Sequence, residues 1–169
     1  ASVLALIRAG ADADVPVLGH CLGGQLMSKA LGGAVSRNPV KEIGWGEVVV
    51  TGRPLAQQWF GHAAQSFVAF HWHGETFTIP PGAERVLTNR HCEDQAFVLG
   101  KHLGMQCHIE MTAEMIDTWC ASGAREISRS RSPAVQSVAA IKSGVEPRLK
   151  ALHQVADCVY AQWMRGLAG

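Results

Sequence analysis

The sequence predicts an α/β fold in which helices cover both faces of a mostly parallel central sheet, as a three-layer sandwich. Short apolar segments typical of strands alternate along the chain with segments of helical periodicity. The segment "VPVLGHC" (15–21) is apolar and reaches a glycine, as buried parallel strands often do. A composition of 47% hydrophobic and 17% charged residues indicates a globular chain. We therefore expect a single domain over residues 1–169.

Periodicity and the positions of Gly, Pro and capping residues predict the individual elements. The helical pattern from residue 22 closes at Gly32 and Gly33, and Thr112 is a suitable N-cap for a later helix. Alternating or continuous apolar runs bounded by turn residues predict strands. Residues 2–14 are expected to hold the end of a helix followed by a polar turn, and the other expected helices are 22–33, 112–122 and about 146–165. The expected strands are 15–21, 34–38, 44–52, 66–73, 94–100 and 103–110, and the segment 79–90 is expected to hold a Pro-Gly turn and then a strand.

The C-terminal part differs in character from the rest. Residues 123–135 are polar and basic, which favours a solvated loop and leaves open a lid or a partner surface. The last predicted helix carries one apolar stripe at alternating steps of three and four residues. Its members are Leu149, Leu152, Ala156, Val159 and Trp163. We expect residues 123–169 to form a helical extension that packs on the domain.

Charge and cysteine content exclude several classes of function. A net charge of +1 gives no indication of a nucleic-acid partner, and no apolar run approaches the roughly 18 residues of a membrane span. The five cysteines are odd in number, widely spaced and without a Cys-x-x-Cys pair. Neither a disulfide framework nor a structural zinc site is therefore expected, and we predict a cytoplasmic protein. Four cysteines are expected to be small buried apolar residues: Cys92, Cys107, Cys120 and Cys158.

The stretch "GHCLGGQ" (19–25) places a cysteine between a predicted strand and a predicted helix. Gly19 and Gly23 lie two residues before and after Cys21, which is the spacing of a nucleophile elbow with Cys in place of Ser. The N-terminus of the following helix stabilises a thiolate, and the N–H of Leu22 is placed to bind an oxyanion. Cys21 is therefore the candidate nucleophile.

A base for this nucleophile is predicted in "QCHIE" (106–110). His108 and Glu110 are two residues apart near the end of a predicted strand, so their side chains project to the same face. A carboxylate in this position holds one tautomer of the imidazole while the other ring nitrogen faces the thiol. The hypothesis is a Cys21–His108–Glu110 triad.

Two motifs give the chain a resemblance to a known family. "GHCLGGQ" matches every fixed position of G-x-C-x-G-x-Q, and "GMQCHIE" (104–110) matches G-x-Q-x-H-x-E. With "EIGW" (42–45) and "FHWHGETFTIPPGA" (70–83), the chain resembles the class I, triad-type glutamine amidotransferases, near the stand-alone bacterial branch of GMP-synthase type. The resemblance implies a flavodoxin-like fold.

The resemblance also implies roles for individual residues. Cys21 would attack the carboxamide of L-glutamine, and the γ-glutamyl thioester would be hydrolysed to glutamate with release of ammonia. Gln25 would help to hold the substrate, and Trp72, His73 and Gly74 would meet its backbone groups. No metal or organic cofactor is implied, and a synthetase subunit that binds in trans is a possible partner.

The chain departs from the family pattern in two places. Relatives carry a Ser-His-Gly-Asp-like loop where "WHGE" (72–75) stands here. Relatives also carry a first strand, a helix and a Gly-rich loop that donates a second oxyanion N–H, and no candidate for that loop precedes Cys21. We expect the chain to be truncated at its N-terminus, without its first strand and oxyanion loop.

Alternative interpretations remain open at this point. A γ-glutamyl peptidase or hydrolase would use the same triad, and "GHCLGG" also resembles the cysteine elbow of dienelactone-hydrolase-type enzymes, with Asp94 as the acid. A non-catalytic scaffold is a third class. His71, His73 and His108 could gather around zinc, but no clearly spaced carboxylate completes such a set, so no metal is predicted. His20 is expected to be a partly buried histidine.

Overall fold

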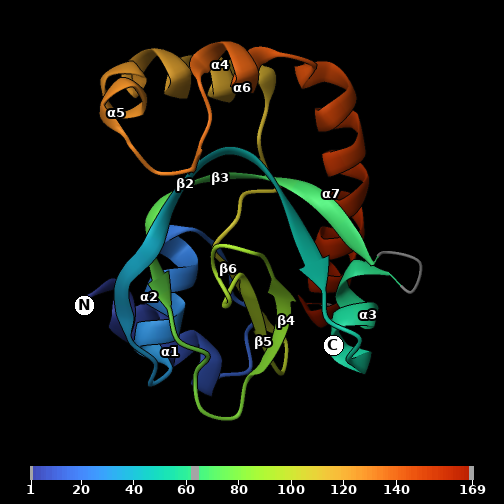
Figure 1. Cartoon of the computed structure of the whole chain (residues 1–169). Helices are drawn as coiled ribbons and strands as arrows, with labels where there is room; N and C mark the ends of the chain where they lie inside the picture. Colours follow the sequence, from blue (N-terminus) through green and yellow to red (C-terminus); the bar gives the residue numbers. More distant parts are fainter. Residues whose placement is uncertain (1, 62–64, 168–169) are drawn as a thin grey trace.

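A computed structural model of the chain describes residues 2–61 and 65–167. The fold is mixed α/β, with a curled sheet whose strands lie in the order β1-β6-β5-β4-β2-β3 and with β7 beside β2 (Figure 1). The helices are α1 (Val3–Asp12), α2 (Leu22–Ala30), α3 (Pro54–Phe60), α4 (Ala113–Ser122), α5 (Ala124–Arg129), α6 (Val138–Lys142) and α7 (Val145–Leu167). The strands are β1 (Leu18–His20), β2 (Val35–Val50), β3 (Ser66–Phe77), β4 (Glu84–Thr88), β5 (Ala96–Leu99), β6 (His102–Met105) and β7 (Ala134–Val135).

The sheet is mixed, so the prediction of a mostly parallel sheet is wrong. Strand β1 runs parallel to β6, and β7 runs parallel to β2. The other pairings in the described chain, β2–β3, β2–β4, β4–β5 and β5–β6, are antiparallel. Parallel neighbours need a long crossover connection, whereas only two residues separate β5 from β6, which permits an antiparallel hairpin alone.

The segments 34–38 and 44–52, predicted as two strands, belong to the single long strand β2. Its pairing with β3 runs from Val35 opposite Phe77 to Val49 opposite Ser66, with a register shift between Arg37 and Glu42. The two strands curve together past the shorter strands β4, β5 and β6 of the same sheet (Figure 1). Strand β3 continues past its predicted end at His73 because β2 supplies a partner to its last residue, Phe77.

Helices lie on both sides of the sheet, with α1 and α2 on one side and α3 and α7 on the other (Figure 1). A small apolar cluster on the side of α1 and α2 has Met27, Phe77 and Phe97 at its centre. The larger core lies on the side of α7. The predicted stripe of α7 faces this core, with Trp163 partly buried and the other members buried: Leu149, Leu152, Ala156 and Val159.

Residues 123–135, predicted as a solvated loop, contain α5 and β7. Strand β7 lies beside β2, and the side chain of Gln136 extends this pairing by accepting from the Trp45 N–H at 2.9 Å and donating to the Trp45 carbonyl at 2.8 Å. Helices α3, α5 and α6 were not predicted, because elements of seven, six and five residues hold too few turns to show a helical period.

The cysteines are free thiols, and one of them departs from its predicted environment. Cys92, Cys107 and Cys120 are buried as expected. Cys158 is exposed on α7, because it lies off the apolar stripe of that helix. It therefore provides an accessible thiol at a distance in sequence from Cys21.

The start of α2 packs so closely on β6 that there is no room for a side chain at Gly24. A Cβ on Gly24 would lie 2.9 Å from the Met105 nitrogen and closer still to its carbonyl oxygen. Both neighbours are backbone atoms of a buried strand, so they cannot move aside without disturbing the sheet. A Cβ on the adjacent Gly23 would meet no atom within 4 Å.

This contrast predicts opposite effects for two neighbouring substitutions. Gly24→Ala should lower the free energy of unfolding by about 1–3 kcal/mol through overpacking against β6. Gly23→Ala should leave it unchanged or raise it by roughly 0.5–1 kcal/mol, because alanine is the better helix former. Urea unfolding of both variants and the wild type measures these differences, and equal effects of the two substitutions would contradict the packing.

Candidate active site

Cys21 lies at the turn between β1 and α2 with an unusual backbone conformation. Its φ of 48° and ψ of −108° fall where residues other than glycine are rarely found. Such a conformation costs on the order of 1–3 kcal/mol and is concentrated at functional sites. The backbone N–H of Cys21 donates to the Met105 carbonyl at 2.8 Å, which ties the turn to the end of β6. Leu22, the first residue of α2, is exposed beside it.

The glycine two residues before Cys21 is required by packing. A Cβ on Gly19 would lie 2.6 Å from the Gly23 carbonyl carbon and 2.8 Å from the sulfur of Met27. The first turn of α2 therefore crosses β1 at a distance that admits no side chain. No steric contact explains the glycine at Gly23 itself.

His108 lies just beyond β6 and is held by β3. Its N–H donates to the Phe70 carbonyl at 2.8 Å, and the Phe70 N–H donates to the His108 carbonyl at 3.2 Å. Its ring packs edge-on against Trp119 at a centroid distance of 5.0 Å. Nδ1 of His108 lies 2.6 Å from Oε1 of Glu110. The carboxylate thus fixes the tautomer, with Nδ1–H as donor and Nε2 left free for a reacting group.

The surroundings of His108 favour its protonated form. Burial disfavours the imidazolium, but hydrogen bonding to Cys21 and Glu110 outweighs burial and raises the pKa of His108 to about 9. For Glu110, burial acts to raise the pKa, and His108 reverses this and lowers it. The Cys21 thiol is near enough to act on the His108 pKa, although Nε2 of His108 makes no hydrogen bond of ordinary geometry within the described chain. Catalytic hydrogen bonds are often long or poorly aligned before substrate binds.

A second histidine and a tyrosine support the carboxylate. Oε2 of Glu110 lies 3.4 Å from Nδ1 of His20, and Nε2 of His20 lies 3.2 Å from the hydroxyl of Tyr160 on α7. Burial lowers the pKa of His20, so a neutral ring with one N–H is favoured. When the tyrosine donates to Nε2, the hydrogen of a neutral His20 lies on Nδ1, which makes no well-formed hydrogen bond within the described chain. His20 was expected only to be a partly buried histidine, and no role was predicted for Tyr160, the only tyrosine of the chain.

Gln25 lies beneath the nucleophile and does not line the cavity described below. It is buried, and its side-chain amide donates to Oε1 of Gln106 at 3.1 Å. The amide of Gln106 in turn lies 3.5 Å from the Cys21 sulfur. In the absence of substrate the side chain of Gln25 contacts Gln106, and its predicted part in holding the substrate stays a prediction. The only sequence signal for Gln106 was its fixed place in "GMQCHIE".

The reactive groups open onto a cavity of about 530 Å³. Its volume lies within the range of small-molecule sites. Two tryptophans form apolar walls, and one carboxylate, that of Glu126, lines it from α5. The full lining is His20, Cys21, Leu22, Trp72, His108, Trp119, Ser122, Gly123 and Glu126.

Only one of the predicted residues of the "WHGE" segment faces this cavity. Trp72 lines it, and its carbonyl oxygen lies 3.8 Å from the Cys21 sulfur. His73 is buried against Glu42, and Gly74 lies beside Lys41 outside the cavity. Neighbouring side chains of a strand point to opposite faces, so the side chains of Trp72 and His73 lie on opposite faces of β3.

Glu126 is a cavity residue that the sequence analysis missed. Hydrogen bonds from Lys41 and from the indole of Trp72 hold the pKa of its carboxyl group below the usual value. The two contacts measure 2.5 Å to Lys41 Nζ and 3.0 Å to Trp72 Nε1. The segment 123–135, predicted to be a loop, therefore contributes a fixed negative charge to the site.

Comparison of the sequence with known proteins finds similarity to glutamine amidotransferases and to GMP synthases. The family model described as glutamine amidotransferase class-I matches residues 2–120. YfeJ of Salmonella typhimurium strain LT2, described as glutamine amidotransferase-like, is 29% identical over 140 residues, which cover 82% of this chain and 59% of YfeJ. The GMP synthase of Vibrio vulnificus is 31% identical over 144 residues, which cover 79% of this chain and 27% of the synthase.

Solved structures agree with these matches. A glutamine amidotransferase from Methylobacillus flagellatus superposes with a TM-score of 0.94 at 43% identity, covering 98% of this chain and 68% of that one. A glutamine amidotransferase from Thermotoga maritima gives a TM-score of 0.84 at 30% identity, covering 95% of this chain and 67% of that one. The chain thus spans 59% of the length of YfeJ and little more than two thirds of these two structures. Among the described residues, no helix has the length and apolar composition needed to cross a bilayer.

The His108 environment predicts a measurable titration. The His108 imidazole should titrate with a pKa of about 9 in the folded protein, against 6.5 as its ordinary value. Its interactions then stabilise the fold fully below pH 6.5, and this contribution is lost as the pH rises to about 9. Glu110→Gln removes the anionic partner, so the pKa of His108 should fall and this pH-dependent stability should become smaller, with the contribution of Cys21 remaining.

The measurement is an NMR titration of the imidazole in both proteins, together with urea unfolding at about pH 6 and about pH 10. The destabilisation by Glu110→Gln should be larger at the lower pH. A wild-type pKa at or below its ordinary value of 6.5 would contradict the geometry.

Proposed function

The chain belongs to the class I glutamine amidotransferase family, and on this premise we propose that it hydrolyses the carboxamide of L-glutamine to glutamate and ammonia through a thioester on Cys21. One observation carries the proposal above the others. A cysteine in a strained turn and an imidazole hydrogen-bonded to a carboxylate open onto one cavity. This combination of nucleophile, base and orienting acid is the arrangement that acyl transfer requires.

In the proposed reaction, the Cys21 thiolate attacks the carboxamide carbon and the carbonyl oxygen becomes an oxyanion. The N–H of Leu22, at the N-terminus of α2, donates to this oxyanion. The imidazolium of His108 gives its Nε2 proton to the departing nitrogen, so that ammonia leaves and a γ-glutamyl thioester remains. His108 then takes a proton from water, which attacks the thioester, and glutamate leaves as the thiol is restored.

Other residues position these groups without touching the reacting atoms. Glu110 holds the His108 ring, and His20, whose other nitrogen contacts Tyr160, lies 3.4 Å from the second oxygen of Glu110. Gln25 acts through Gln106, whose amide lies against the sulfur. We therefore place Gln25 among the positioning residues.

Recognition of glutamine requires an anion for its α-ammonium group. Among the described residues that line the cavity with Cys21, Glu126 is the carboxylate. Trp72 and Trp119 flank the same space and would enclose the aliphatic part of the substrate. We propose Glu126 as the partner of the α-ammonium group. His73 and Gly74, expected to read the substrate backbone, would act only through the position of β3.

The acceptor of the ammonia remains a proposal drawn from relatives. The GMP synthases that resemble this chain are longer, and the chain covers only 27% of the Vibrio vulnificus protein. A synthetase that binds in trans is the partner we propose. A γ-glutamyl peptidase, which would use the same groups on a different leaving group, makes a distinct prediction in the assay below.

Replacement of the nucleophile should abolish the proposed reaction. Cys21→Ala should lower glutaminase activity by at least about 10³-fold, because no other group can form the thioester. A glutamine-derived diazo-ketone should modify Cys21 alone in the wild type, which peptide mass spectrometry reports. The exposed Cys158 is the internal control, since a thiol that is merely accessible should remain unmodified.

The assay also separates the alternative function. Ammonia release from glutamine should exceed the cleavage of γ-glutamyl dipeptides in kcat/KM. Preferential cleavage of the dipeptides would assign the site to a γ-glutamyl hydrolase instead. Labelling of Cys158 in place of Cys21 would count against both functions.

Another prediction concerns Glu126. Glu126→Gln should raise the KM for glutamine by roughly tenfold with little change in kcat, since a tenfold change corresponds to about 1.4 kcal/mol of lost binding. Glu114→Gln is the matched control, because Glu114 is exposed in the first turn of α4 and does not line the cavity. An equal effect of both substitutions would remove Glu126 from substrate recognition.

A further inference from the structure

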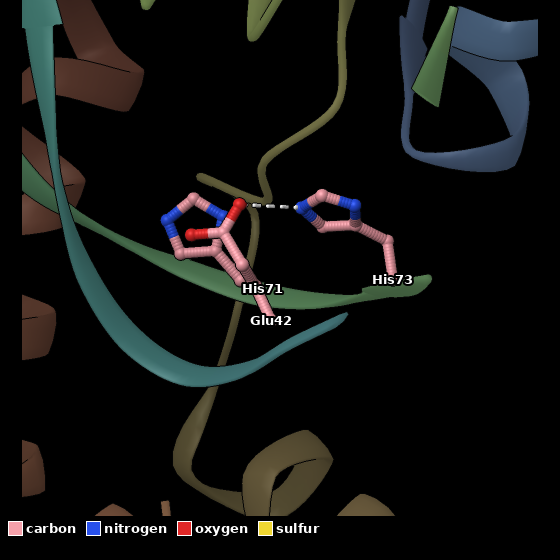
Figure 2. A group of neighbouring side chains, drawn as sticks. All are labelled: Glu42, His71 and His73. Carbon is pink, nitrogen blue, oxygen red and sulfur yellow. Dashed lines mark ion pairs between the residues drawn. The ribbon is translucent and has the colours of Figure 1, made fainter. Parts of the chain in front are cut away.

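Three buried titratable side chains lie together outside the catalytic cavity. Glu42 of β2 is opposite His73 of β3, and His71 lies two residues before His73 on the same face of that strand. All three residues are buried, with exposed fractions of 3%, 1% and 5% for Glu42, His71 and His73. Their ligand atoms lie within 4.8 Å of one another. Figure 2 shows the side chains converging from the two strands.

The tautomer of His73 is set by a backbone carbonyl. Its Nδ1 lies 2.9 Å from the carbonyl oxygen of Glu75, which can only accept, so Nδ1 carries the hydrogen. Nε2 then presents a lone pair, and it lies 3.1 Å from Oε2 of Glu42. A lone pair facing a carboxylate oxygen is repulsive unless a cation or a proton lies between them.

His71 repeats this arrangement from the other side of the carboxylate. Its Nε2 lies 3.4 Å from the Gly46 carbonyl oxygen, so this nitrogen is the donor. With Nε2 as the donor, a neutral His71 ring carries a lone pair on Nδ1. Nδ1 of His71 and Nε2 of His73 are both buried and lack a hydrogen-bond partner within the described chain. Buried polar atoms without partners are rare in folded proteins.

The carboxylate between them is oriented by two amides. Asn89 donates to Oε1 of Glu42 at 2.7 Å, and Gln95 donates to Oε2 at 3.1 Å. Carbonyls behind the imidazoles and amides behind the carboxylate are the outer contacts that typically surround metal ligands. A single proton on Nε2 of His73 would satisfy only that pair, and Nδ1 of His71 would still lack a partner.

We propose that Glu42, His71 and His73 form a binding site for one divalent transition-metal ion, of which zinc is the best fit. Two imidazoles and one carboxylate are a common zinc ligand set, with a fourth position left open. Zinc bonds of about 2.0–2.2 Å at tetrahedral angles place neighbouring ligand atoms roughly 3.3 Å apart, close to the separation of Nε2 of His73 and Oε2 of Glu42. Calcium and magnesium favour oxygen ligands, so they suit this set poorly.

A second cavity provides access to the cluster. It has a volume of about 410 Å³, and its lining includes Glu42, His71 and Asn89. The fourth coordination position can therefore hold a solvent molecule that enters from this side. The cavity is separate from the catalytic one, because the lining of neither contains a residue of the other.

The site lies back to back with the catalytic cavity. Trp72, between the two histidines, points the opposite way and contacts the Cys21 sulfur through its carbonyl oxygen. An ion that joins β2 to β3 at Glu42 would fix the strand that forms this wall. Metal binding is thus expected to stabilise the fold, whether or not the proposed glutaminase reaction occurs.

The test is metal titration of the tag-free protein in a Cys21→Ser background, which removes the catalytic thiol as a competing ligand. Zinc should bind at one equivalent and raise the midpoint of thermal unfolding. Cobalt at the same site should give visible d–d absorption without the near-ultraviolet charge-transfer band of a thiolate. His71→Gln should weaken binding by more than about 100-fold, beyond the roughly 10- to 100-fold loss expected for an outer contact.

The variants are chosen so that loss of folding does not decide the result. His71→Gln keeps a donor for the Gly46 carbonyl and a similar length, and Glu42→Gln keeps the shape of the carboxylate. His153→Gln is the matched control, because His153 on α7 donates from Nε2 to the Met111 carbonyl and lies outside the cluster. Circular dichroism verifies the fold of each variant.

The outcomes separate the proposal from its alternatives. Saturable one-equivalent binding that His71→Gln and Glu42→Gln weaken, and that His153→Gln leaves intact, supports the site. Absence of saturable binding, equal loss in the control, or a thiolate band in the cobalt spectrum would overturn it. Protonated His73 at neutral pH in an NMR titration of metal-free protein, without metal uptake, would assign the cluster to an ion pair instead.

Discussion

The site depends on the short segment that leaves β6, because this segment holds both reacting groups through its backbone. The Met105 carbonyl accepts from the N–H of Cys21, and three residues later His108 exchanges two hydrogen bonds with Phe70 of β3. Nucleophile and base are thereby fixed to one piece of chain by main-chain contacts. Side-chain rotamers alone would not give this precision, since each free rotatable bond adds conformational entropy that the reaction must overcome.

The same constraint explains why the turn at Cys21 can remain strained. The closely packed glycines, Gly19 on β1 and Gly24 on α2, bring helix and sheet together without side chains between them. The helix cannot move away to relax the positive φ of Cys21 without losing this contact and the hydrogen bond to Met105. The strain places the sulfur at the edge of the cavity, beside the first N–H groups of α2.

The pairing of β2 with β3 positions side chains both in the catalytic cavity and in the buried cluster of Glu42, His71 and His73. Alternation along β3 sends Trp72 to the catalytic cavity and sends its neighbours His71 and His73 toward Glu42 on the other face. The helices that follow β6 then close the catalytic side, where Glu126 of α5 meets Trp72 and Lys41. A change that shifts β3 would therefore alter the cavity wall and the buried cluster together.

Local spacing in the sequence was enough to predict the elbow at Cys21, the pairing of His108 with Glu110, the apolar stripe of α7 and the family. These features depend on residues a few positions apart, which share a turn, a strand face or a helix face. Other features became visible only in the folded chain: the direction of the strands, the contact of Gln25 with Gln106, the approach of Tyr160 to His20, and the meeting of Glu42 with two histidines of another strand. Each of these depends on long-range pairing, because the register of strands and the packing of helices bring together residues that no local period relates.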